Sequence, residues 1–224
     1  MIYKTRSITL KDGRGAILRA PRESDAEEML EYLRTASGET DFLASYPEEL
    51  KFTAEGERAY LKNNLDSPNT MMLVCEVDGK PQAYAYASHF HERAAFQWDA
   101  ELSVYVAACA QQRGIGRALY ACLIAFLQEQ GYSTLYALIT VPNDNSERLH
   151  AKLGFERAAL YPRTGYKFGQ WRDMIVMEKR LSPPFAPPEP PHAFSTLPAA
   201  FVENVLREEA AKCNAKTEAG NPQR

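Results

Sequence analysis

Hydrophobic and polar residues follow two different periods along this chain. Between residues 100 and 106 they alternate at every position, which is typical of a half-buried β-strand. Between residues 119 and 127 apolar residues recur at intervals of three and four, which is typical of an amphipathic helix. The two patterns together predict an α/β protein. In the strand, one face carries Leu102, Val104 and Val106, and the other carries Glu101, Ser103 and Tyr105.

Turn residues divide the rest of the first 181 positions into further elements. Asp12 to Gly15 and the pair Asp78-Gly79 lie between β-prone runs and predict two hairpins. Helices are predicted over residues 21–37 and 142–152, and residues 39–69 form a polar stretch that favours helix. Strands are predicted over residues 8–10, 16–19, 71–77, 82–88, 134–140 and 173–179.

The composition changes after Leu181. Residues 182–191 contain six prolines, which favour an extended linker over packed structure. Residues 199–212 return to helical spacing, and this helix can dock on its own domain or on a partner. The predicted organisation is one domain over residues 1–181, a proline-rich linker over 182–198, a C-terminal helix over 199–213 and a disordered tail over 214–224.

Charge and cysteine content narrow the function classes. The formal net charge of -3 provides no basic stripe to neutralise phosphates, so nucleic-acid binding has little support and small molecules are the expected partners. The four cysteines show neither metal-ligand nor disulfide spacing, so no metal is expected. No apolar run reaches the roughly 18 residues that a membrane span needs, and a cytoplasmic location is expected.

Two glycines stand between the alternating strand and the amphipathic helix. The segment Gln111-Gln112-Arg113-Gly114-Ile115-Gly116-Arg117-Ala118 places free backbone N–H groups at a helix start, where the helix dipole favours a phosphate group. A turn that only begins the helix is the alternative. The segment lacks the Gly-Lys-Ser/Thr of a Walker loop and the third glycine of a dinucleotide fingerprint.

A group of motifs in residues 70–180 resembles the general N-acetyltransferase (GNAT) superfamily. The general motifs are Gln111-x-x-Gly114-x-Gly116, Asn143-x-x-Ser146-x-x-Leu149-His150 and Lys152-Leu153-Gly154-Phe155. Within the superfamily the likeness is closest to phosphinothricin-type acetyltransferases. This narrower likeness rests on residues 93–101, 103–106, 141–144 and 165–173.

The resemblance implies a fold, a co-substrate and residues that hold it. The fold is a mixed, mostly antiparallel sheet flanked by helices, and the co-substrate is acetyl-coenzyme A. The strand backbone at Val104, Tyr105 and Val106 would pair with the pantetheine arm as an added strand does. The pyrophosphate would be cradled by Arg113, Gly114, Ile115, Gly116, Arg117 and Ala118, and Asn143 would contact the co-substrate near the second helix. Resembling enzymes often pair, so a homodimer is one expected arrangement.

Two residues are candidates for the chemistry. An amine with a pKa near 10 arrives protonated and must lose a proton before it attacks a thioester. Glu101 lies where the resembling enzymes carry their base, and a surface glutamate or an ion-pair partner is the alternative. His150 stands where many superfamily members carry a tyrosine. It would protonate the leaving thiolate or relay a proton, and a histidine that only packs or caps the helix is the alternative.

Two further residues bear on the amine substrate. Arg93 lies where the resembling enzymes bind the acidic part of an amino-acid analogue, a role that suits a guanidinium; an exposed loop arginine is the alternative. Phe96 replaces the usual tyrosine of these enzymes. Residues 39–49 resemble other GNAT proteins more than they resemble the phosphinothricin-type enzymes. The expected substrate is a small amino acid or its analogue. A polyamine, an aminoglycoside, a protein N-terminus or a non-catalytic acyl-coenzyme A sensor are the rivals.

Overall fold

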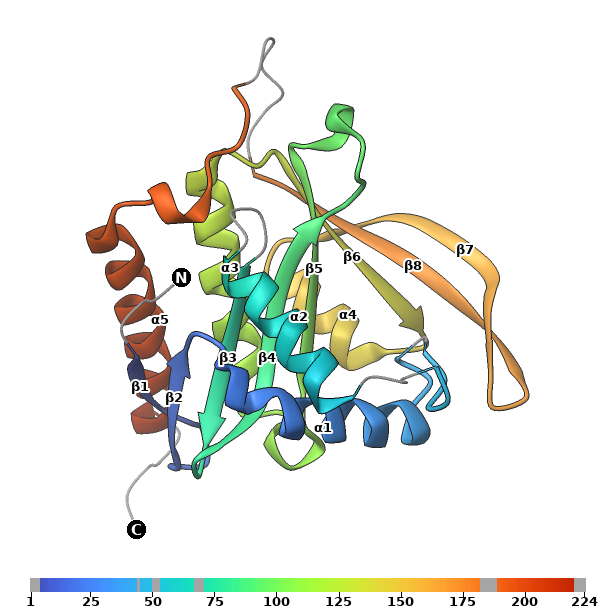
Figure 1. Cartoon of the computed structure of the whole chain (residues 1–224), viewed down its shortest axis with the longest axis horizontal. Coiled ribbons are helices and arrows are strands. Elements are labelled where there is room, and N and C mark those ends of the chain that lie inside the picture. Colours follow the sequence, from blue (N-terminus) through green and yellow to red (C-terminus); the bar gives the residue numbers. More distant parts are fainter. Residues whose placement is uncertain (1–4, 44, 50–52, 67–70, 182–188, 220–224) are drawn as a thin grey trace.

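Eight strands form a single sheet in the order β1-β2-β3-β4-β5-β6-β8-β7 (Figure 1). The computed structural model describes residues 5–43, 45–49, 53–66, 71–181 and 189–219. The neighbouring strands are antiparallel except for β5 and β6, so the prediction of a mostly antiparallel mixed sheet is confirmed. The strands are β1 (Arg6–Thr9), β2 (Gly15–Arg19), β3 (Met71–Val77), β4 (Lys80–His89), β5 (Asp99–Val106), β6 (Thr134–Val141), β7 (Glu156–Lys167) and β8 (Gln170–Arg180).

Helices cover both faces of this sheet. The helices α1 (Ala26–Glu39) and α2 (Ala54–Asp66) pack against β3 and β4 on the face toward the viewer in Figure 1. The helices α3 (Ile115–Gln130), α4 (Asp144–Lys152) and α5 (Ala199–Ala219) lie on the other face. Short 3-10 turns complete the fold: η1 (Glu23–Asp25), η2 (Ala94–Phe96), η3 (Ala108–Ala110) and η4 (Phe194–Thr196). Each face of the sheet has its own hydrophobic core, and the alternating residues 100–106 of β5 contribute to both. Leu102 packs in the core toward α3, and Tyr105 packs in the core toward α1.

The turns follow from their residues. Asp78 and Gly79 both adopt positive φ, 52° and 78°, as a two-residue hairpin turn between antiparallel strands requires. Gly131 ends α3 with φ of 92°, a left-handed conformation that glycine adopts without steric cost. The Asp78-Gly79 turn stands where the sequence predicts it.

The strand β7 is absent from the sequence-based prediction. It is an edge strand whose one partner among the described strands is β8, and most of its residues are exposed. An exposed edge strand does not need an apolar face, so its sequence carries no alternation to detect. The first helix also differs from its prediction, because Gly38 lies inside α1 and the helix continues to Glu39.

The C-terminal helix docks on its own domain. Helix α5 packs against β1 and α3 and buries Val202, Val205 and Leu206. The preceding segment is packed as well: the Trp98 indole donates to the Glu189 carbonyl at 2.8 Å, and Phe194 is 5% exposed. The helix continues to Ala219. The predicted helix end at residue 213 and the predicted disordered tail from residue 214 are therefore wrong. Residues 182–188 of the predicted linker and residues 220–224 of the predicted tail lie outside the described part of the chain. No helix in the described ranges has the length and apolarity to cross a bilayer.

A buried ion-pair network joins β2, η1 and β3. Arg19 is 2% exposed, and its guanidinium donates to both carboxylate oxygens of Asp25 at 2.7 and 2.8 Å. It also donates to Glu76 at 2.6 Å and to the Ala20 carbonyl at 3.0 Å. The same Asp25 carboxylate accepts the backbone N–H of Arg22 at 2.8 Å. The network therefore fixes where the chain leaves β2 and enters α1.

Candidate active site

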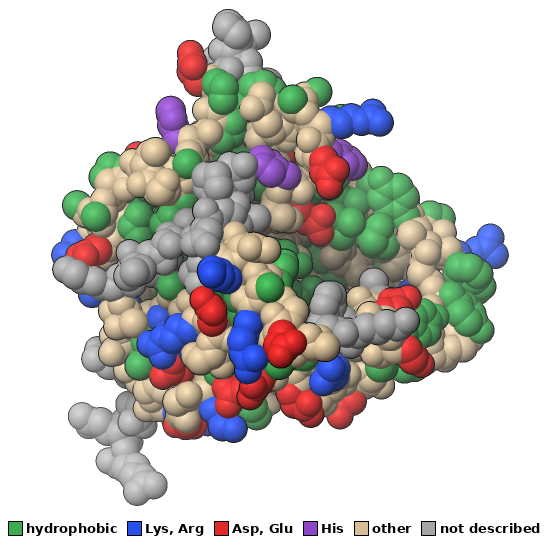
Figure 2. Space-filling view, in the orientation of Figure 1, with side chains coloured by type: hydrophobic (Ala, Val, Ile, Leu, Met, Phe, Trp, Pro, Cys, Tyr) green, Lys and Arg blue, Asp and Glu red, His purple; other side chains and the backbone are tan. Residues whose placement is uncertain are grey.

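The sheet divides at Glu101. The parallel strands β5 and β6 pair at three positions only: Asp99 with Thr134, Ala100 with Leu135 and Glu101 with Tyr136. Beyond Glu101, β5 continues to Val106 beside β4, whereas β6 continues beside β8. A split therefore opens in the sheet at this residue. Figure 2 shows a hollow on the face covered by α1 and α2, at the place where β5 and β6 separate in Figure 1.

Glu101 is half-buried at the last paired position of β5 and β6. Burial raises the pKa of its carboxyl, and the nearby charge of His91 lowers it by a smaller amount. The neighbouring strand places Ser88 directly opposite Glu101, and Tyr86 opposite Ser103. The polar face predicted from the alternation therefore exists, and it carries Glu101 and Ser103 beside Ser88 and Tyr86 of β4.

Aromatic rings pack on the same face of β4 and β5, on the side of Glu101 that leads to Val106. Tyr105 lies 5.0 Å from the ring centre of Tyr84 and 6.3 Å from that of Tyr86, and Tyr32 of α1 contacts Tyr84. Burial raises the pKa of the Tyr105 phenol, and Tyr86 raises it further. The Tyr105 side chain thus packs as a strand aromatic, while the backbone of Val104 to Val106 faces the split.

The glycine segment begins α3 at the far end of β5. Gly114 adopts φ of 89°, and the first helical bond runs from the Ala118 N–H to the Gly114 carbonyl at 3.1 Å. The N–H groups of Ile115, Gly116 and Arg117 precede that ladder and can bind an anion. A Cβ on Gly116 would lie 3.5 Å from Leu149 Cδ2 and 3.6 Å from Val106 Cγ2. These are ordinary van der Waals distances, so Gly116 packs closely on α4 and β5, and it is the free N–H groups at the start of α3 that suit a diphosphate ester.

Both arginines of the segment contact carboxylates from distant parts of the chain. Arg113 Nε lies 3.0 Å from Asp12 in the β1–β2 turn, and Arg117 Nη1 lies 3.0 Å from the buried Glu209 of α5. Lys11 of the same turn lies beside Gly114, with its Cε 3.8 Å from the position of a Cβ on that glycine. The sequence motif gave no sign of this lysine, because the hairpin brings it there.

His150 and Asn143 have structural partners in α4. The Asn143 side chain accepts the Ser146 N–H at 3.1 Å and caps the helix. His150 is 2% exposed, and burial lowers its pKa, while its hydrogen bond to the Ser146 carbonyl acts in the opposite direction. Its Nδ1 lies 2.8 Å from that carbonyl, and its Nε2 lies 3.3 Å from the Tyr120 hydroxyl.

Tyr120 links this histidine to the split. Its hydroxyl donates to the Leu102 carbonyl of β5 at 2.9 Å, one residue after Glu101. A sequence-based search misses Tyr120 because it occupies a core position of α3, where an aromatic residue is expected to pack. His150 therefore reaches β5 through Tyr120 and not by direct exposure to the hollow.

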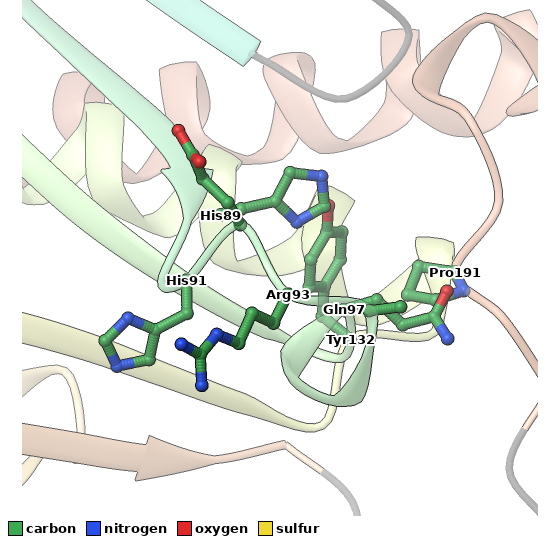
Figure 3. A pocket seen from close by; sticks show the side chains of 8 residues that line it. His89, His91, Arg93, Gln97, Tyr132 and Pro191 are labelled. Carbon is green, nitrogen blue, oxygen red and sulfur yellow. The ribbon is translucent and has the colours of Figure 1, made fainter.

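Arg93 and Phe96 lie together on the connection from β4 to β5. Arg93 precedes η2 and is exposed, Phe96 is 39% exposed, and the His91 ring lies 4.9 Å from the Phe96 ring. Figure 3 shows the Arg93 guanidinium beside the His91 ring, turned away from Tyr132 and Pro191. A pocket of about 200 Å³ lies between this connection and the C-terminal segment at Pro191. Among the described residues, no group of three metal-ligating side chains occurs.

Known proteins share this architecture. The phosphinothricin N-acetyltransferase of Streptomyces viridochromogenes is 38% identical to this chain over 118 residues. The match covers 53% of this chain and 64% of that relative, which is less than two thirds of its length. The L-methionine sulfoximine/L-methionine sulfone acetyltransferase of Salmonella typhimurium is 36% identical, with coverage of 52% and 68%. Among solved structures, a GNAT superfamily phosphinothricin acetyltransferase from Sinorhizobium meliloti in complex with acetyl-coenzyme A is 27% identical, with a TM-score of 0.69. The superposition includes 80% of this chain and 98% of that one.

The family model for the acetyltransferase (GNAT) domain matches residues 18–176, which include the split, the glycine segment and Glu101. This is most of the chain, and it ends before the segment that leads to α5. The chain therefore belongs to the GNAT acetyltransferase domain family.

Proposed function

We propose that this protein transfers the acetyl group of acetyl-coenzyme A to the primary amine of a small amino acid or amino-acid analogue. The observation that carries the proposal is the position of Glu101, a half-buried carboxylate at the point where β5 and β6 separate. The named substrates of the relatives, phosphinothricin and methionine sulfoximine, support this class of acceptor. In this proposal Glu101 serves the α-amine of such a substrate and Arg93 its acidic group.

The chain's own groups divide the work between the two ends of β5. At one end the N–H groups of Ile115 and Gly116 would hold the diphosphate, and the backbone of Val104 to Val106 would pair with the pantetheine arm. When bound, acetyl-coenzyme A supplies the acetyl thioester. At the other end the Glu101 carboxylate takes the proton from the ammonium group of the substrate, so that the free amine can attack.

His150 acts through Tyr120 in this proposal. With 2% of its surface exposed, the imidazole has no direct access to the hollow, and its lowered pKa keeps it neutral near pH 7. The neutral ring donates its Nδ1–H to the Ser146 carbonyl, so its Nε2 can only accept a hydrogen bond. The Tyr120 hydroxyl, 3.3 Å from Nε2, donates to the Leu102 carbonyl of β5 and can turn to donate to Nε2 instead. We therefore assign His150 the role of a proton relay through Tyr120, in which Nε2 takes the hydroxyl proton while the phenol oxygen receives one from the reacting groups. Asn143 is assigned a contact to the co-substrate from the cap of α4.

A panel of amines tests the function. Release of coenzyme A is measured with purified protein, acetyl-coenzyme A and phosphinothricin, methionine sulfoximine, common amino acids, polyamines or an aminoglycoside. We expect turnover with the acidic amino-acid analogues and a rise in their KM of about tenfold in Arg93→Gln, because a charged hydrogen-bond pair contributes about 1.5 kcal/mol. Turnover confined to cationic amines would overturn the substrate class, and tight co-substrate binding without turnover would favour an acyl-coenzyme A sensor.

The two arginines of the glycine segment are expected to behave differently. In Arg113→Gln the Kd for coenzyme A should rise about three- to tenfold, because its partner Asp12 is 34% exposed and can release this guanidinium to a phosphate group. In Arg117→Gln it should change about twofold at most, since its partner Glu209 is only 8% exposed and keeps that guanidinium in a buried ion pair. Calorimetric titration with coenzyme A measures both values. Equal losses in the two variants would contradict the assignment and return Arg117 to the phosphate site.

We extend the proposal to a cytoplasmic location and to a homodimer, as the sequence analysis expects. Light scattering coupled to size-exclusion chromatography decides the second point, since a dimer doubles the mass of the 25.2 kDa chain.

A further inference from the structure

The ammonium group of Lys167 is buried among backbone carbonyls. Lys167 ends β7 and is 4% exposed. Its Nζ donates to the carbonyls of Thr40 at 2.9 Å, Leu43 at 2.6 Å and Ser45 at 2.9 Å, and lies 5.1 Å from the centre of the Phe168 ring. Three N–H donors therefore meet three acceptors, which is the full donor capacity of a lysine.

All three carbonyls belong to the segment that follows α1. We call residues 40–43 and 45–46 the acceptor loop. Its Asp41 forms an ion pair with Arg172 of β8, and the Tyr46 hydroxyl donates to the Tyr166 carbonyl of β7. The Ser37 hydroxyl of α1 also donates to the Ser45 carbonyl. The acceptor loop is thus held by the β7–β8 hairpin through Lys167, Arg172 and Tyr166.

These contacts join the two halves of the divided sheet. The acceptor loop continues from α1, which packs with β4 on the β5 side of the split. The β7–β8 hairpin belongs to the β6 side. Past Glu101 no β5–β6 pairing joins these halves, so a link between them must come from elsewhere. On the face with the hollow, the acceptor loop and the hairpin provide that link.

We propose that Lys167 is a positioning residue that fixes the acceptor loop across the split and so sets the shape of the amine site. The inference rests on the proposed function, since it assigns the wall of the acceptor side. It also accounts for the need for a lysine here: a flexible stem with a three-donor head can satisfy three converging carbonyls, whereas a planar guanidinium cannot.

Burial and the nearby carboxylates act on this ammonium in opposite directions. Burial lowers the pKa of Lys167, while Asp41 and Glu49 raise it. Removal of the ammonium would leave three carbonyls of the acceptor loop without their donor, and these groups would turn toward water. The loop would move and the cradle at α3, which has no contact with Lys167, would not.

The test compares Lys167→Met with Lys80→Met, a matched control at an exposed lysine that pairs with Glu28. In Lys167→Met, amide hydrogen exchange over residues 38–49 should accelerate at least about tenfold, with unchanged exchange over residues 111–118. The KM for the amine should rise at least about tenfold, and the KM for acetyl-coenzyme A should stay within about twofold. Lys80→Met should match the wild type in each measurement.

Different results separate this inference from the proposed function. Unchanged exchange over residues 38–49, or equal rises in both KM values, would overturn the role of Lys167. Absence of turnover with every amine would overturn the function, while exchange would still test the loop. If Lys167→Met does not fold, Asp41→Asn replaces it, because this variant keeps the ammonium and removes the loop's ion pair with Arg172. It should accelerate exchange over residues 38–49 and raise the KM for the amine, each by less than Lys167→Met. Wild-type exchange with an unchanged KM for the amine would contradict the proposal.

Discussion

Replacement of Glu101 by Gln should lower kcat about 10²- to 10⁴-fold, which is the usual contribution of a general base. The amide has nearly the same shape as the carboxylate and cannot accept the proton from the ammonium group of the substrate. The cradle lies at the opposite end of β5, so the Kd for coenzyme A should remain within about twofold of the wild-type value. Steady-state kinetics of coenzyme A release and calorimetric titration give the two quantities.

The pH profile provides an independent check on Glu101. Because burial raises the pKa of this carboxyl, the base form is lost as the pH falls through a value above that of an ordinary glutamate. The wild-type kcat/KM should therefore decline on its acid side at a higher pH than a solvated glutamate would cause. Glu156→Gln, an exposed glutamate of β7, is the control and should leave rate and profile unchanged. Undiminished turnover in Glu101→Gln would remove the base assignment.

Replacement of Asp25 by Ala should lower the free energy of unfolding by about 3–5 kcal/mol. Arg19 and Asp25 are 2% and 4% exposed, so the substitution leaves a buried guanidinium with Glu76 as its remaining carboxylate. It also removes the acceptor of the Arg22 N–H at the entry to α1. Urea denaturation followed by circular dichroism measures the change.

Two further variants identify the cause of this loss. The exposed pair Arg148–Asp144 serves as the control, and Arg148→Gln should change the unfolding free energy by less than about 0.5 kcal/mol. The double variant Arg19→Met with Asp25→Ala should be less unstable than the sum of its single variants, because it removes the unpaired charge. Additive losses would show that the two side chains stabilise the fold independently.

Local patterns in the sequence determined the scaffold and the chemistry-bearing positions. The strict alternation of residues 100–106 places Glu101 on the polar face, and the glycines at 114 and 116 start α3 in the form that the structure has. The Asp78-Gly79 turn follows from the φ values that it requires. These features need information from a few neighbouring residues only, since strand period, helix period and turn geometry are local properties of the chain.

The tertiary structure decided which partners those residues have. The motif predicts that Arg117 faces a phosphate, but α5, almost a hundred positions later, brings Glu209 to it. The sequence predicts only that His150 is a helix residue near the site. The folded chain shows that it is buried and that its Nε2 lies beside the Tyr120 hydroxyl of α3. Likewise, β7 exists because β8 offers it a pairing edge, not because of its own pattern.

Lys167 illustrates the physical reason for this division. Its three acceptors are main-chain carbonyls of residues 40, 43 and 45, and main-chain carbonyls are the same whatever side chains accompany them. A sequence records periodicity and residue chemistry, which determine that the protein forms this sheet and carries a carboxylate at its centre. Contacts between distant backbone groups have no signature in either, so only the folded chain reveals how the two sides of the split are held.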